Sequence, residues 1–88
     1  MKPYQTITID DNTFDRIFSL DVLSEELVWH RDKKDRTLLV LEGENWSIQF
    51  DNFMPEKLIK DEEYYIPKNT YHRVIKGSSS LKVRITEL

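Results

Sequence analysis

"LVWHRDKKDRTLLVLEG", residues 27–43, places a histidine and two aspartates among basic residues, between two apolar segments. Its second half, residues 36–43, is a nearly continuous apolar run, which is typical of a buried strand. The first half alternates, and alternate residues of a strand share a face. A strand over 27–31 would therefore direct His30, and Asp32 just beyond its end, to the same side. We expect both side chains to face a cavity, with an exposed turn before the return strand.

The rest of the chain also favours short strands. Apolar residues recur mostly at every second position, and turn residues interrupt them about every eight to twelve residues, which is typical of an all-β sandwich or barrel. The predicted strands are residues 27–31, 37–42, 46–50, 56–59, 63–66, 71–76 and 81–87, with a further strand in YQTITI (4–9). The residues expected to be largely buried are Val28, Leu38, Val40, Ile48, Phe50, Val74, Val83 and Ile85.

One region allows two interpretations. Residues 12–27 contain apolar Phe14, Ile17 and Phe18 at a spacing that a helix could use, with Asn12 as its N-terminal cap. The same stretch can instead be strand or irregular structure, which is the interpretation that we favour.

Length and composition predict a single small domain over residues 1–88. The net charge of −3 argues against a nucleic-acid partner. The chain has no cysteine, which excludes disulfides, thiolate metal sites and a cysteine nucleophile. No signal peptide or membrane span is visible, so we expect a cytoplasmic location and no membrane partner. Only two glycines are present, so Asn and Asp are expected at left-handed turn positions.

His30, Asp32 and the distant His72 form a candidate metal site. Two histidines and one carboxylate are the ligand set that suits non-haem Fe(II) or Mn(II). They neutralise part of the charge of a divalent ion and leave positions open for water or substrate. From the residues alone, an alternative is equally concrete: the histidines hydrogen-bond inside or at the rim of a barrel, and Asp32 pairs with Arg36.

The segments that carry these residues resemble the two motifs of the cupin superfamily. The first motif is, in outline, His-x-His-x3–4-Glu-x6-Gly; here it reads His30-Arg31-Asp32, KKD, Arg36, TLLVLE, Gly43. The second is Gly-x5-Pro-x-Gly-x2-His-x3-Asn; here it reads Asp61, EEYYI, Pro67-Lys68-Asn69, TY, His72, RVI, Lys76. Asn69 can replace glycine because asparagine tolerates the left-handed conformation. The resemblance runs from Leu27 to Leu88 and implies a single cupin-like β-barrel (a double-stranded β-helix, or jelly roll). The alternative fold is an open β-sandwich without a central cavity.

Two departures from the motif leave the function open. Asp32 stands where the family has its second histidine, and it can still be a ligand. Arg36 stands where the family has glutamate, and it cannot be a ligand because a guanidinium has no lone pair to give. One expectation is therefore a site for Fe, Mn, Zn or Ni at His30, Asp32 and His72, in an oxygenase or isomerase that acts on a small carbohydrate or acid. The other is a metal-free binding or structural protein in which Arg36 reaches Asp32 or the ligand. An enzyme would require Arg36 to point away from the histidines.

Three further residues are candidates for the lining of a small-molecule pocket: Arg36, Trp46 and Tyr64. Aromatic side chains are common in such pockets, but for most of the aromatic residues, a set that includes Trp46 and Tyr64, we favour core or dimer contacts. The resemblance also implies a homodimer, because small cupin-like barrels commonly pair through an outer sheet face.

Overall fold

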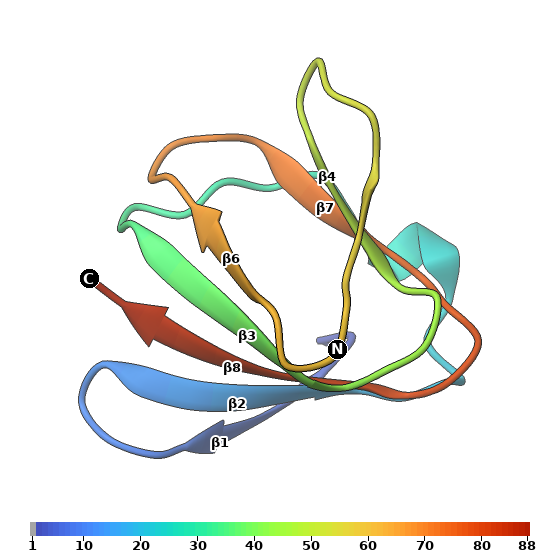
Figure 1. Cartoon of the computed structure of the whole chain (residues 1–88), viewed down its shortest axis with the longest axis horizontal. Coiled ribbons are helices and arrows are strands. Elements are labelled where there is room, and N and C mark those ends of the chain that lie inside the picture. The colour runs from blue at the N-terminus through green and yellow to red at the C-terminus, as the bar shows by residue number, and fades with distance from the viewer. Residues whose placement is uncertain (1) are drawn as a thin grey trace.

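The computed structural model describes residues 2–88, and its regular structure is almost entirely strand (Figure 1). The strands are β1 (Gln5–Thr8), β2 (Thr13–Phe18), β3 (Arg36–Glu42), β4 (Ser47–Phe50), β5 (Glu56–Lys57), β6 (Glu63–Ile66), β7 (His72–Ile75) and β8 (Leu81–Glu87). One 3-10 turn, η1 (Ser24–Glu26), lies between β2 and β3. The all-β prediction is confirmed.

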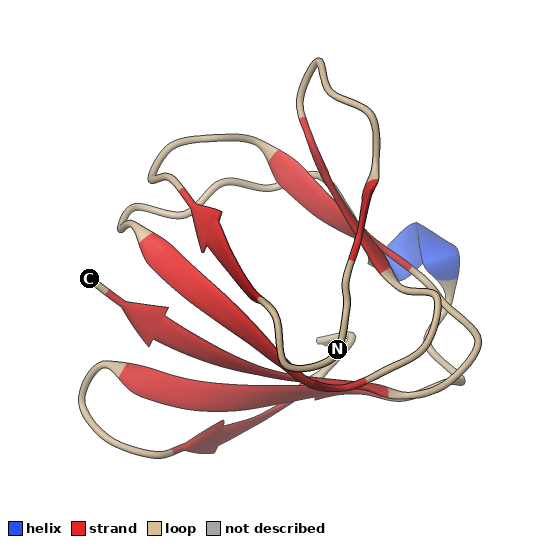
Figure 2. Ribbon diagram, viewed as in Figure 1, coloured by secondary structure: helices blue, strands red, loops and turns tan. Residues whose placement is uncertain are grey.

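The strands form two antiparallel sheets that face each other (Figure 2). The larger sheet has five strands in the order β1-β2-β8-β3-β6, and the smaller has three in the order β5-β4-β7. The C-terminal strand β8 thus lies in the middle of the larger sheet, between β2 and β3. This order places the C-terminal strand directly beside β3, which follows residues 27–35, and places β2 on the other side of β8.

The core lies between the sheets and follows the alternation of the strands. Leu38 and Val40 of β3 pair with Ile85 and Val83 of β8, and all four are buried. Ile48 of β4 meets them from the smaller sheet and is fully buried. Burial of these apolar side chains removes them from water and holds the sheets together.

The predicted strand over 27–31 is wrong. Only His30 forms a bridge, through reciprocal backbone hydrogen bonds of 2.9 Å between its amide and carbonyl and those of His72. Without a continuous ladder, nothing holds the segment in the two-residue alternation of a strand, and Val28 is 61% exposed rather than buried. Phe50 and Val74 are only partly buried, at the edge of the core.

Residues 12–27 adopt the strand and irregular structure that we favoured, not the helix. Thr13–Phe18 pairs along its whole length with β8, from Thr13↔Thr86 to Phe18↔Leu81. In that ladder, backbone N–H and C=O groups of the strand pair with those of β8, and the strand thereby becomes part of the five-stranded sheet. The chain then leaves the sheet and forms η1 before it reaches His30.

Asparagine and aspartate take the left-handed turn positions, as expected from the shortage of glycine. Positive φ angles occur at Asn45 (62°), Asn52 (66°), Asp61 (71°) and Asn69 (60°). Asn69 is the position that replaces glycine in the second motif. Within the described residues, no helix is long and apolar enough to cross a membrane.

Candidate functional site

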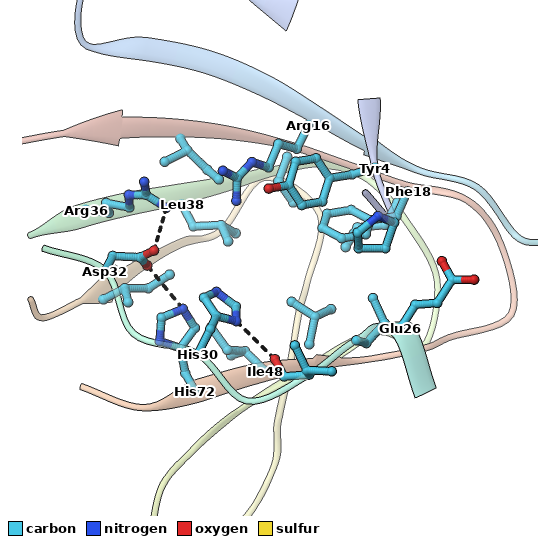
Figure 3. Close-up of a pocket in the computed structure, with 18 residues that line it drawn as sticks. Tyr4, Arg16, Phe18, Glu26, His30, Asp32, Arg36, Leu38, Ile48 and His72 are labelled. Atoms are coloured by element: carbon cyan, nitrogen blue, oxygen red, sulfur yellow. Dashed lines mark hydrogen bonds and ion pairs between the residues drawn. The ribbon is translucent and has the colours of Figure 1, made fainter. Parts of the chain in front are cut away.

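A cavity of about 250 Å³ lies between the two sheets (Figure 3). Its inner wall is apolar and comes from both sheets: Leu38, Ile48, Ile66, Val74, Leu81, Val83 and Ile85. Its polar side is formed by Arg16, His30, Asp32, Arg36 and His72. A central cavity is therefore present, and the alternative of a sandwich without one is wrong.

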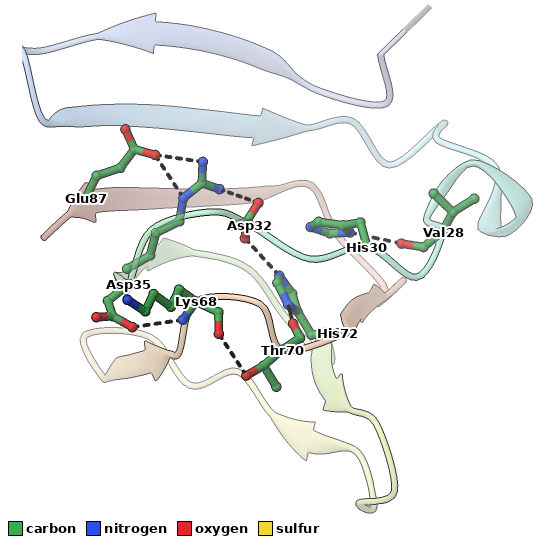
Figure 4. A network of polar contacts seen from close by, with 9 residues as sticks. Val28, His30, Asp32, Asp35, Lys68, Thr70, His72 and Glu87 are labelled. Carbon is green, nitrogen blue, oxygen red and sulfur yellow. Dashed lines mark hydrogen bonds and ion pairs between the residues drawn. The ribbon is translucent and has the colours of Figure 1, made fainter.

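The structure brings together the three predicted metal ligands. One nitrogen or oxygen atom each from His30, Asp32 and His72 all lie within 4.8 Å of one another. His72 begins β7, and the backbone bridge sets His30 directly opposite, with the ring centroids 4.3 Å apart. Asp32, two residues later, reaches the same point (Figures 3 and 4). The loop before β3 thus supplies two of the groups and the smaller sheet the third.

Both imidazole rings are oriented by backbone carbonyl groups. The Nδ1 atom of His30 lies 3.0 Å from the Val28 oxygen, and Nδ1 of His72 lies 2.8 Å from the Thr70 oxygen (Figure 4). A carbonyl oxygen only accepts hydrogen bonds, so the ring proton of each neutral histidine belongs on Nδ1. Nε2 of each ring is then left with a free lone pair. This arrangement is common among histidines that bind metals.

The two carboxylate oxygens of Asp32 lie in different environments. Its Oδ1 is 3.1 Å from Nη1 of Arg36, which forms an ion pair. Its Oδ2 is buried, has no hydrogen-bond donor among the described residues, and lies 3.4 Å from Nε2 of His72. A buried carboxylate oxygen that faces an imidazole lone pair is unfavourable unless a cation or a proton lies between them.

His72 is suited to the neutral state that metal binding requires. Its side chain is buried, and burial lowers the pKa of its imidazole below the ordinary value. The neighbouring His30 and Arg36 also lower the pKa, against the Thr70 carbonyl and Asp32, which raise it. The ring is therefore neutral near pH 7, with its free Nε2 directed at Asp32.

Arg36 does not point away from the site. Its Nη1 contacts Asp32, while Nη2 and Nε lie 2.9 Å and 3.2 Å from Oε2 of Glu87. Glu87, at the end of β8, offsets much of the positive charge that Arg36 brings near the histidines. The sequence motifs gave no signal for Glu87, because its place depends on β8 pairing beside β3.

Arg16, on β2, is a second residue that sequence reasoning missed. Its guanidinium lies over the ring of Tyr4, with the Cζ atom 4.1 Å from the centroid, and over Phe14 at 5.0 Å. Its Nε is buried without a hydrogen-bond partner among residues 2–88. The available signal was the alternation on β2, which places Phe14, Arg16 and Phe18 on one face.

Trp46 and Tyr64, which the sequence suggested as pocket residues, do not line this cavity. Trp46 is fully buried in the core, and its Nε1 donates to the Ser79 carbonyl at 2.8 Å. The Tyr64 hydroxyl forms two hydrogen bonds with the backbone at and after the end of β5. It accepts one from the Ile59 amide and donates one to the Lys57 carbonyl. Both aromatic residues stabilise the framework, as the alternative interpretation had it.

Proteins similar to this chain are found by their structure and not by their sequence. No protein-family model matches the sequence, and no curated protein is significantly similar to it. An RmlC-like cupin family protein with a double-stranded β-helix fold from Methanocaldococcus jannaschii superposes with a TM-score of 0.73, at 13% identity, over 99% of this chain and 81% of that one. A cupin superfamily protein from Desulfitobacterium hafniense gives 0.66 at 23% identity, over 97% and 75%.

The chain has a cupin fold. The cupin fold of this chain also matches FeII HppE, solved in complex with substrate, with a TM-score of 0.70 and 16% identity. That match covers 97% of this chain and 52% of HppE, so this chain spans about half of that protein. Identities at this level establish the shared fold. The chemistry of the site depends on the residues described above.

Proposed function

We propose that this cupin binds one divalent transition metal through His30, Asp32 and His72, and that it binds a small polar molecule at that metal. The buried Asp32 Oδ2 atom, which lacks a donor and faces the free lone pair of His72, is the observation that carries the proposal. A divalent cation at this point would satisfy the carboxylate and both imidazoles together. The donor set fits Fe(II) or Mn(II) best, while Zn and Ni are also compatible with it.

The residues around the three ligands support this role. The carbonyl groups of Val28 and Thr70 fix the tautomers that leave Nε2 free. Arg36 holds the other oxygen of Asp32 and so fixes the direction of the carboxylate. When bound, such a metal acts as a Lewis acid that polarises a ligand in one of its open positions. The apolar wall of the cavity limits bulk water around that ligand.

One observation favours a second candidate, a metal-free binding protein. Arg36 contacts Asp32 at 3.1 Å, as that alternative requires. The contact uses only one carboxylate oxygen, however, and among residues 2–88 the second oxygen has no hydrogen-bond donor and faces Nε2 of His72 at 3.4 Å. The structural match to FeII HppE adds support for a metal, since a protein of this fold is known with iron.

The test is isothermal titration of chelator-treated protein with Mn²⁺, Zn²⁺ and Ni²⁺, and with Fe²⁺ under anaerobic conditions. We expect about one metal per chain, and at least about 10-fold weaker binding in Asp32→Asn and in His72→Gln, since both remove a ligand. Asp35→Asn is the matched control. Asp35 lies on the same loop, but its carboxylate accepts a hydrogen bond from the Lys68 amide at 2.8 Å instead of facing the site. Wild-type protein that binds none of the four metals, or equal losses in Asp35→Asn and Asp32→Asn, would favour the metal-free alternative.

A further inference from the structure

The guanidinium of Arg16 is held in place by aromatic rings. It lies over Tyr4 and Phe14, with Cζ 4.1 Å and 5.0 Å from the ring centroids. Contacts of this kind use the flat faces of the guanidinium and stabilise its position. The N–H groups point outward along its edges, which are the part that binds a carboxylate.

Among residues 2–88, no carboxylate forms an ion pair with the N–H groups on these edges of Arg16. Its buried Nε makes no hydrogen bond within the same part of the chain. A buried donor without an acceptor costs free energy, and an ion without a counterion costs more. Arg16 lines the cavity directly, so a ligand that enters the cavity can supply the missing acceptor (Figure 3).

The balance of charge in the cavity also favours an anion. The positive charges of Arg16 and Arg36 are matched in number by the negative charges of Asp32 and Glu87. The proposed metal would add two positive charges, and the exposed Glu26 at the rim removes only one. An anionic ligand would therefore enter a site of net positive charge.

The remaining wall sets the shape of the ligand. Leu38, Ile48 and Val83 are typical of an apolar lining that offers no further polar partner. The volume of about 250 Å³ is below that of most pockets for drug-sized molecules. A small molecule with one charged end and a short apolar body fits these walls better than a sugar or an inorganic anion.

We infer that the cavity binds a small organic carboxylate whose charged group is held by the edge of Arg16 and whose apolar body lies against the wall between the two sheets. The inference deepens the proposed function and rests on it for two features, the net positive charge of the site and the placement of the ligand beside the metal. Anchoring by Arg16 does not require the metal.

The experiment compares hexanoate, hexanamide and acetate by isothermal titration on chelator-treated protein and on protein loaded with Mn²⁺. Hexanoate should bind at least about 10-fold more tightly than hexanamide, which lacks the charge, and than acetate, which lacks the apolar body. Arg16→Met should abolish the preference for hexanoate over hexanamide. Arg31→Met is the control, because Arg31 also lies over an aromatic ring, that of Tyr71, but is exposed outside the cavity.

The outcomes separate this inference from the proposed metal. A preference for hexanoate that depends on Arg16 supports the inference, even in protein that binds no Mn²⁺. Equal binding of hexanoate and hexanamide by wild-type protein overturns it, even if Mn²⁺ binds, and so does equal loss in Arg16→Met and Arg31→Met. If Arg16→Met fails to fold, Arg16→Lys takes its place. Lysine keeps the charge without the bidentate edge, so hexanoate binding should weaken by about 10-fold.

Discussion

Asp32 shows how one residue links the stability of the protein to its site. Its Oδ1 atom is in an ion pair with Arg36, while its Oδ2 atom is buried beside the lone pair of His72. Without a cation, this second oxygen contributes a desolvation cost and no compensating bond. A ligand that binds only the folded state stabilises it by mass action, so the proposed metal should raise the melting temperature of the chelator-treated protein.

The buried His72 predicts a pH dependence of stability in metal-free protein. Burial lowers the pKa of His72 in the folded state below its unfolded value, so the unfolded chain binds its proton more readily. The stabilising contribution is present above about pH 6.5, the unfolded value, and is lost as the pH falls through the lower folded value. We expect the free energy of unfolding in urea, with chelator present, to decrease as the pH falls below about 6.5.

His72→Gln serves as the comparison for that measurement. Glutamine does not titrate, so the variant should show a smaller decrease of the free energy of unfolding over the same pH range. An identical pH dependence in the variant and the wild type would show that His72 is not the group responsible.

At the level of residues, the sequence predicted the ligands but not their surroundings. His30, Asp32 and His72 were identified because motif spacing places them on adjacent segments of a barrel. Arg16 and Glu87 were missed because they lie on strands that reach the site only through sheet order, which alternation does not specify. Trp46 was placed in the pocket because an aromatic residue suits a ligand site and a core equally well.

The elements were predicted in type more accurately than in extent. The strands from β3 to β8 were predicted within a few residues, because their apolar residues alternate and Gly, Asn or Asp marks their ends. Residues 27–31 show the same alternation but form only the bridge at His30. The alternation of apolar and polar residues indicates which side chains share a face of the segment. It does not indicate whether a partner strand lies beside the segment along its whole length.

The turn between β7 and β8 packs directly on the turn between β3 and β4. The Ser78 amide donates to the Glu44 carbonyl at 2.9 Å, and the Trp46 indole donates to the Ser79 carbonyl at 2.8 Å. Gly77 lies at their closest approach, where a Cβ atom would overlap the Glu44 carbonyl oxygen and Cδ1 of Trp46. This contact requires a residue without a side chain.

Gly77→Ala should therefore destabilise the protein strongly. We expect a loss of about 3 kcal/mol in the free energy of unfolding, at the upper end for overpacking, because backbone atoms on the opposite turn cannot move aside easily. Chemical denaturation measures the effect. Ser80→Ala in the same turn is the control and should change stability by less than about 0.5 kcal/mol, since Ser80 is exposed. Similar stability of the two variants would contradict this packing.

The whole molecule combines an apolar core with a cavity that the core only partly fills. The five-stranded and three-stranded sheets share one cluster of buried residues, and His30, Asp32 and Arg16 form part of the polar side of the cavity. Arg16 lies on β2, and the backbone bridge to His72 fixes His30 to β7. The fold thus provides the orientation, while the identity of a few residues provides the chemistry.

A homodimer remains a proposal at this scale. β1 is an edge strand whose four residues are all exposed, and Ile7 and Ile9 are 48% and 49% exposed. Pairing of two chains through the outer sheet face that carries β1 would cover this apolar surface. Light scattering at tens of micromolar should give about twice the chain mass of 10.6 kDa.

Two variants locate the proposed interface. Ile7→Glu should shift the mass toward that of a monomer, because a charge would be buried at the interface. Ile59→Glu should not, since Ile59 is 55% exposed but lies outside the edge strand. A monomeric wild-type protein at these concentrations would contradict the dimer.

The most direct test of the metal site is an anomalous difference map from crystals grown with Mn²⁺ and without chelator. We predict a single strong peak in each chain, in contact with Nε2 of His30, Nε2 of His72 and Oδ2 of Asp32, with histidine–metal bonds similar to the roughly 2.1 Å found in zinc sites. The peak should be absent in Asp32→Asn crystals grown in the same way. A wild-type map with no peak between these three atoms, while Arg36 still contacts Asp32, would contradict the site.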